Sequence, residues 1–293
     1  MGILLGLLTA LSWGSGDFIA RLATHRIGAL RCQLYMQLLG FLLLSLTLPW
    51  LGGFGHLADG SGWQPWAWGV LAGVFNAFST LALYRAFEVG KMAVVAPLSA
   101  SYPALTLLFS WLSGEHLSRL RICGIALTLL GMMMVAGGEH VPGESDANRG
   151  GAPAKNTKGL GPALGSAIGF GVLFWLLGIR VIPRVGATQT VWLIRLTSAV
   201  ITVAIILLFK QPIRLPAGRV RGMALGMGLF DSGAFVLSNI GMQREQVAVI
   251  SVLGSLYGAV TVGLATIFLR EHLSRWQWLG IATIFVGIYL ISR

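Results

Sequence analysis

The feature that most constrains this chain is a series of long apolar runs separated by short polar connections. About 20 helical residues are needed to cross the hydrocarbon core of a bilayer. Ten runs near this length occur, at 3–23, 31–51, 66–86, 92–113, 121–137, 160–178, 187–209, 220–241, 247–269 and 276–292. Lipid offers no hydrogen-bond partner to backbone polar groups, so only helices and closed barrels can span it. Because the runs show no strict alternation of apolar and polar residues, the sequence predicts an all-α polytopic membrane protein with ten transmembrane helices.

Composition excludes the soluble classes of protein. Hydrophobic residues make up 55% of the chain and charged residues 11%, whereas a soluble domain carries about 25% charged residues. The net charge of +11 does not indicate a nucleic-acid partner, because the basic residues stand singly at the ends of apolar runs. Residues 3–16 have the length of a signal-peptide core, but no basic residue precedes them, so we interpret them as part of the first span. We expect a multi-pass protein of a bacterial or archaeal inner membrane, in contact with the lipid bilayer.

The chain divides into two similar halves. The strongly polar stretch 138–159 separates residues 1–137 from residues 160–293, and each half holds five of the runs. The pentapeptide EHLSR occurs at 115–119 and again at 271–275, and HRIGA at 25–29 matches PRVGA at 183–187. Two five-helix repeats are therefore predicted.

An odd number of helices in each repeat fixes their relative orientation. The first repeat begins on one side of the membrane and the second begins on the other, so the two must be inverted about a pseudo-two-fold axis in the membrane plane. Inverted repeats are typical of secondary transporters, whose substrate site lies near the bilayer midplane where the repeats meet. The sequence thus predicts two inverted five-helix repeats around a central cavity.

Short motifs are spread along the first half and are partly repeated in the second. They are Trp13-Gly14, Tyr84-x-Ala86 with Gly90, Val95-x-Pro97-Leu98, Tyr102-Pro103, Gly114-Glu115, Gly124 and Gly131. In this order they resemble the drug/metabolite transporter superfamily, in particular proteins with two EamA domains. The resemblance implies ten helices, a central cavity, and export or exchange of small organic solutes such as amino acids, amines, nucleobase-type metabolites or sugars.

The second half departs from the pattern in its ninth run. Leu253 and Gly258 stand near the register of Pro97 and Pro103, so a bend there is expected from Gly254 and Gly258 rather than from proline. The orientation of the termini has two interpretations. The resemblance implies that the amino terminus is inside the cell, whereas arginine and lysine are concentrated after the odd-numbered runs, which favours both termini outside.

Three ionisable residues lie deep in the runs, namely Asp17, Arg195 and Asp231. Such residues are costly in a bilayer and usually face a cavity or a partner. In the register of the repeats, Asn76 falls opposite Asp231, and Gln37 falls opposite Arg195. With aromatic residues on the same helix faces, the candidate substrate- or ion-binding residues are Trp13, Asp17, Gln37, Asn76, Tyr84, Tyr102, Trp192, Arg195, Asp231 and Tyr257.

Each candidate also has a structural interpretation. Asp17 and Arg21 stand four residues apart and can form an intrahelical ion pair, and Asp231 and Arg195 can neutralise each other. Asn76 can serve only as a hydrogen-bonding residue between helices. The aromatic residues can be packing residues.

The charges suggest a mechanism. A carboxylic acid in a low-dielectric cavity can bind and release protons near neutral pH, so the sequence favours proton-coupled export of a cationic or zwitterionic metabolite such as an amino acid or amine. A facilitator or uptake carrier for a neutral solute such as a sugar, and a non-transporting scaffold or receptor domain, are the alternatives. The partners expected are a small-molecule substrate and protons, with the chain a monomer or homodimer.

Catalysis is not expected. The sequence has no His-Glu-x-x-His or Gly-x-Ser-x-Gly motif, and Cys32 and Cys123 lie in separate runs without ligand spacing. We therefore predict no catalytic residue, no metal site and no cofactor.

Overall fold

The computed structural model describes residues 1–50, 60, 62–90, 92–137, 159–213, 217–269 and 275–291. These residues contain helices and no strand. The helices of the first half are α1 (Gly2–Ile27), α2 (Ala29–Thr47), α3 (Gln64–Val89), α4 (Met92–Ser99), α5 (Pro103–Leu112) and α6 (Arg119–Gly137). Those of the second half are α7 (Leu160–Leu176), the π-helical turn η2 (Leu177–Val181), α8 (Ile182–Val185), α9 (Ala187–Leu208), α10 (Arg219–Met242), α11 (Val247–Ser255), α12 (Tyr257–Leu269) and α13 (Arg275–Ile291).

Helices occupy all ten predicted runs. Among the described residues, seven helical segments are long and apolar enough to cross a membrane, and shorter apolar helices lie at Pro103–Leu112 and Trp278–Leu290. The outer faces of the bundle expose large apolar side chains such as Leu11, Phe78 and Phe285, as expected for surfaces in contact with lipid. The chain is thus a multi-pass membrane protein. The predicted connection 138–159 lies, apart from Gly159, outside the described residues.

Two of the ten runs are broken near their middle. In the fourth run α4 ends at Ser99 and α5 begins at Pro103, while in the ninth run α11 ends at Ser255 and α12 begins at Tyr257. The first break follows from proline, which cannot continue a helix by donating a hydrogen bond. At the second, a Cβ atom on Gly258 would lie 3.1 Å from the Cβ of Ala100. Glycine at this position therefore favours close packing between the two breaks, since a side chain would press on Ala100.

The turns that follow the first span of each half have the same backbone conformation. Gly28 separates α1 from α2 with φ 82° and ψ 158°, and Gly186 separates α8 from α9 with φ 84° and ψ 160°. Only glycine adopts such positive φ values without strain. These two residues belong to the matching HRIGA and PRVGA segments, so the sequence repeat corresponds to a repeat of structure.

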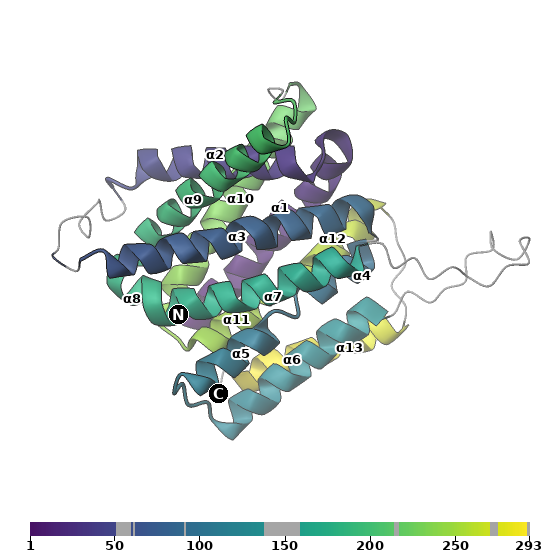
Figure 1. Ribbon diagram of the computed structural model, residues 1–293. Coiled ribbons are helices and arrows are strands. Elements are labelled where there is room, and N and C mark those ends of the chain that lie inside the picture. The colour runs from purple at the N-terminus through teal and green to yellow at the C-terminus, as the bar shows by residue number, and fades with distance from the viewer. Residues whose placement is uncertain are drawn as a thin grey trace, which may run out of the picture.

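The helices pack in matched pairs. In Figure 1, α6 and α13 lie side by side along one edge of the bundle, and α2 and α9 lie at the opposite edge. α1 packs against α10 as α3 packs against α7, and α1 also contacts α11 and α12 as α7 contacts α4 and α5. The buried core runs through the centre of this arrangement, where all nine residues of α11 are buried.

Candidate functional site

A central cavity is formed where α1, α3, α7 and α10 meet the two broken runs. Its lining side chains are those of Trp13, Asp17, Thr80, Leu83, Tyr84, Tyr102, Phe170, Phe174, Asp231, Phe235 and Tyr257. The cavity volume is about 30 Å³. Both tyrosines at the helix breaks, Tyr102 and Tyr257, contribute to the wall. An interruption of a membrane helix is tolerated where it is buried in protein or lines a cavity.

Asp17 is buried on the face of α1 that lines the cavity. Small residues allow α1 to approach its neighbours closely: a Cβ atom on Gly14 would lie 2.5 Å from Cγ1 of Val260. One turn further along α1, Arg21 donates from Nη1 to the carbonyl oxygens of Phe87 and Gly90 at the end of α3. Among the described residues Asp17 has no ion-pair partner, so the intrahelical pair with Arg21 considered from the sequence is not what the structure contains.

Asp231 forms an ion pair with Arg195. The guanidinium of Arg195 is completely buried, and it also donates to Oε1 of Gln37 over 2.9 Å. Its centre lies 5.0 Å from the centroid of the Phe235 ring, within the range of a cation–π contact. The positive charge of Arg195 is therefore engaged by protein groups behind the cavity wall.

An aromatic layer lies beside the two carboxylates. The ring of Trp13 meets the rings of Phe174 and Phe235 edge to face at 5.5 and 5.2 Å. Tyr102 stacks on Phe174 at 4.8 Å. Because Trp13 precedes Asp17 on α1, this layer lies between Asp17 and the face of the bundle that holds the amino terminus, called here the amino-terminal face.

The two tyrosines at the helix breaks differ in their hydrogen bonds. The hydroxyl of Tyr102 donates to the carbonyl oxygen of Ser251 over 3.0 Å, which ties the break in the first half to α11. The hydroxyl of Tyr257 is buried and has no hydrogen-bond partner among the described residues. Because Tyr257 lines the cavity, its hydroxyl is placed to bond water or another molecule in the cavity.

Six of the ten predicted site residues line the cavity: Trp13, Asp17, Tyr84, Tyr102, Asp231 and Tyr257. The other four lie elsewhere. Gln37 and Arg195 bind each other behind the wall, Asn76 donates to the hydroxyl of Ser198 over 3.0 Å, and Trp192 donates to the hydroxyl of Ser45 over 2.9 Å. The apolar lining residues Leu83, Phe170, Phe174 and Phe235, and the polar Thr80, were not among the predicted candidates.

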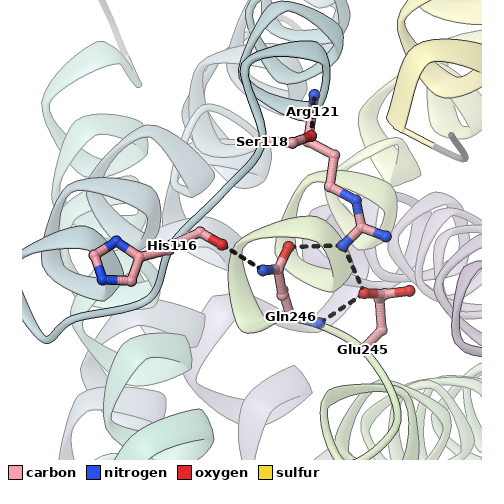
Figure 2. A network of polar contacts seen from close by, with 5 residues as sticks. All are labelled: His116, Ser118, Arg121, Glu245 and Gln246. Carbon is pink, nitrogen blue, oxygen red and sulfur yellow. Dashed lines mark hydrogen bonds and ion pairs between the residues drawn. The ribbon is translucent and has the colours of Figure 1, made fainter.

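A polar network closes the amino-terminal face (Figure 2). Arg121 at the start of α6 forms an ion pair of 2.8 Å with Glu245, which precedes α11. The same guanidinium donates to Oε1 of Gln246 over 2.7 Å, and the side-chain amide of Gln246 donates to the carbonyl oxygen of His116 over 2.7 Å. The network thus fastens the start of α11 to α6 and to the loop that precedes α6.

The described residues contain no group of three or more histidine, cysteine, aspartate or glutamate side chains placed to hold a metal ion. The central cavity offers instead one carboxylate without an ion-pair partner, one neutralised carboxylate, three tyrosines and an aromatic wall. These groups can offer a charge, hydrogen bonds and aromatic faces to a bound molecule.

Comparisons with known proteins agree with the fold. The model of a family described as the EamA-like transporter family matches residues 1–137 and again residues 157–293. An uncharacterized protein of Methanocaldococcus jannaschii is 27% identical over 135 residues, which cover 46% of this chain and 95% of that protein. A solved crystal structure of a protein with no stated function superimposes with a TM-score of 0.77 at 21% identity, over 99% of this chain and 95% of the other.

Proposed function

The chain belongs to the EamA-like transporter family, and on this premise we propose that it exports a small organic cation by alternating access, in exchange for protons. The observation that carries the proposal is the position of Asp17, a buried carboxylate without an ion-pair partner among the described residues, in a cavity with largely aromatic walls. Aromatic faces attract cations through their quadrupoles, most strongly where water is excluded.

The charge balance of the cavity favours a cation over a zwitterion. Arg195 neutralises Asp231, so the ionised cavity keeps one uncompensated negative charge, on Asp17. None of the lining residues is basic. The carboxylate of an amino acid would therefore find no charged partner in the cavity wall, whereas an amine finds Asp17. This narrows the expectation from the sequence, which included a zwitterionic substrate and had Arg195 among the candidate substrate- or ion-binding residues.

The helix pairing supports an inverted relationship between the repeats. Gln33 of α2 donates to Thr202 of α9 over 3.0 Å, while further along α2 the hydroxyl of Ser45 accepts from Trp192. The two equivalent helices therefore run antiparallel. α6 and α13 also run antiparallel to each other, because Gly131 lies against Gly280 and Gly287 lies against Gly124. Repeats related in this way can exchange conformations and open the central site to each side in turn.

Export of the cation is coupled to entry of protons if the proton and the cation bind the Asp17 carboxylate one at a time. On one side of the membrane the cation binds and the carboxylic acid gives up its proton. On the other side the cation leaves and a proton takes its place. Each ligand then weakens the binding of the other by the same factor, as linkage requires.

The test is transport by the purified protein in liposomes. Amines, quaternary ammonium ions, amino acids and sugars are first screened for thermal stabilisation, and the strongest ligand is then followed under an imposed pH gradient. Asp17→Asn should abolish pH-driven transport and keep the fold. Ser15→Ala is the matched control, because the Ser15 hydroxyl is exposed and bonds only its own helix, at the Leu11 carbonyl.

Three results contradict the proposal. Undiminished pH-driven transport by Asp17→Asn would remove the role of this carboxylate. Movement of a sugar without any effect of the pH gradient would indicate a facilitator for neutral solutes. Stabilisation by none of the compounds, with no transport, would favour a scaffold or receptor domain.

A further inference from the structure

A second pocket lies at the amino-terminal face, outside the central cavity. It is bounded by the start of α3 and by the η2–α8 segment, and its lining residues are Trp63, Gln64, Ala67, Trp68, Leu71, Arg180 and Arg184. None of these residues lines the central cavity. Nothing in the proposed transport mechanism uses this pocket.

The described lining residues of the pocket carry two positive charges and no negative one. Arg180 and Arg184 are both exposed and stand four residues apart, a spacing at which like charges on a helix repel. Neither arginine forms an ion pair with a carboxylate of the described residues, and no acidic residue lines the pocket. The guanidinium of Arg180 lies over the ring of Trp68, 5.8 Å from its centroid. A guanidinium stacked in this way keeps its N–H groups available in their plane for an anion.

The pocket becomes more apolar with depth. Both bounding segments reach the amino-terminal face: α3 begins there at Gln64, and α8 ends there at Val185. Leu71 is seven residues further into the membrane than Gln64, about 10 Å at the rise of an α-helix. Arg180 is likewise deeper than Arg184, at the level of Trp68. Tryptophan and snorkelling arginine are the side chains that settle at the boundary between headgroups and hydrocarbon.

We propose that this pocket binds an anionic phospholipid. The phosphodiester would lie between Arg180 and Arg184, where charge-assisted hydrogen bonds with guanidinium groups are strongest. An acyl chain would follow Ala67 and Leu71 toward the membrane interior. The polar-to-apolar order along the pocket matches a lipid, whereas a soluble anion such as phosphate would gain nothing from its deeper, apolar part. Basic pockets between membrane helices are a known mode of headgroup binding.

The experiment uses the full chain purified in detergent. Dioleoylphosphatidylglycerol, dioleoylphosphatidylcholine and inorganic phosphate are titrated separately, and binding is followed by native mass spectrometry and by thermal stabilisation. The test variant is R180Q/R184Q. The control is R119Q/R244Q, which removes two exposed arginines from the same face but outside the pocket.

Phosphatidylglycerol should bind the unmodified protein and the control equally. We expect R180Q/R184Q to bind it about 30-fold more weakly, the factor that two basic residues contribute beside an anionic headgroup. R184Q alone leaves the contact between Arg180 and Trp68 in place and should bind about fivefold more weakly. Because both arginines are exposed, all variants should elute and melt like the unmodified protein when no lipid is added.

The proposal is overturned if R180Q/R184Q keeps its affinity for phosphatidylglycerol, or if the control loses as much, which would indicate only general surface charge. Equal binding of phosphatidylcholine would remove the role of the negative charge. Stabilisation by inorganic phosphate at the same concentration would identify a site for soluble anions instead of a lipid.

Discussion

The guanidinium of Arg195 and the side-chain amide of Gln37, which stand at equivalent positions of the two sequence halves, are joined by a buried hydrogen bond of 2.9 Å. This pair of equivalent residues thus joins α2 and α9, which are themselves equivalent helices, beside the contacts Gln33–Thr202 and Trp192–Ser45. Because Arg195 also forms the ion pair with Asp231, this connection extends to the wall of the cavity. The two deep carboxylates consequently differ in their partners: Asp231 pairs with Arg195, whereas Asp17 has no ion-pair partner among the described residues and is the group that we propose binds ligands.

This difference predicts that substitutions in the Arg195–Asp231 pair lower the stability of the protein, whereas substitution of Asp17 does not. Arg195→Met leaves the carboxylate of Asp231 without its partner, and Asp231→Asn leaves a completely buried guanidinium without its counter-charge. Each change should lower the free energy of unfolding by about 3–5 kcal/mol, measured by thermal unfolding in detergent. Asp17→Asn should unfold close to the unmodified protein, because no ion pair is broken.

The double variant R195M/D231N tests whether the pair acts as a unit. It should lose less stability than the two single variants together, because neither charge is then left buried alone. Strictly additive losses would mean that the two residues act independently.

The tyrosines at the helix breaks predict a second contrast. Tyr102→Phe removes a buried hydrogen bond to the Ser251 carbonyl and leaves that acceptor unsatisfied, so it should lower stability by about 1–3 kcal/mol. Tyr257→Phe removes a hydroxyl that has no partner among the described residues, so it should not lower stability. If the Tyr257 hydroxyl contacts substrate, Tyr257→Phe should instead raise the KM for transport. A loss of stability in Tyr257→Phe with unchanged KM would contradict this assignment.

A third prediction concerns the close approach of α1 to α12. Gly14→Ala would place its Cβ 2.5 Å from Cγ1 of Val260, so the helices must separate, at a cost of about 1–3 kcal/mol. Gly165→Ala in α7 is the matched control, because a Cβ there meets nothing within 4 Å. The control should be neutral or stabilising by up to about 1 kcal/mol. Thermal unfolding of Gly14→Ala and Gly165→Ala is compared under the same conditions. Equal stabilities would mean that α1 and α12 can move apart without loss of stability.

Both carboxylates of the cavity wall were among the residues singled out from the sequence. Asp17 and Asp231 stand out because an ionisable residue is rare in an apolar run unless it faces a cavity or a partner. Trp13 was found through its spacing of four residues from Asp17 on the same helix. A bend in the ninth run was expected at Gly254 and Gly258, whereas the fourth run was expected as one span over 92–113.

The apolar part of the site could not be predicted in the same way. Phe170, Phe174 and Phe235 line the cavity, but phenylalanine is equally compatible with lipid, so its position in an apolar run gives no indication of the direction in which it points. Arg195 presents the opposite difficulty. Its depth is the same whether it faces the cavity or a partner, and only its register match with Gln37 hinted at the contact that the structure contains. The π-helical turn at Leu177–Val181 has no evident cause in its residue types.

The final prediction concerns the network at the amino-terminal face (Figure 2). Arg121 and Glu245 fasten the start of α11, and α11 fills the centre of the bundle on this side of the aromatic layer. Opening the cavity to this face would require α11 to move relative to α6. Glu245→Gln should therefore make opening easier. Both side chains are about one-fifth exposed, so the pair contributes at most about 1 kcal/mol, equivalent to roughly a fivefold change in the opening equilibrium.

Hydrogen exchange measured by mass spectrometry can detect this change. In Glu245→Gln, the amides of α11 and of the first two turns of α1, which α11 contacts, should exchange up to about fivefold faster. Glu88→Gln is the control, because Glu88 pairs with Arg85 of the same helix over 2.8 Å and, among the described residues, forms no ion pair with α6 or α11. If both variants exchange alike at α11, the ion pair between Arg121 and Glu245 does not restrain the opening of this face, and the restraint must come from the packed rings of Trp13, Phe174 and Phe235.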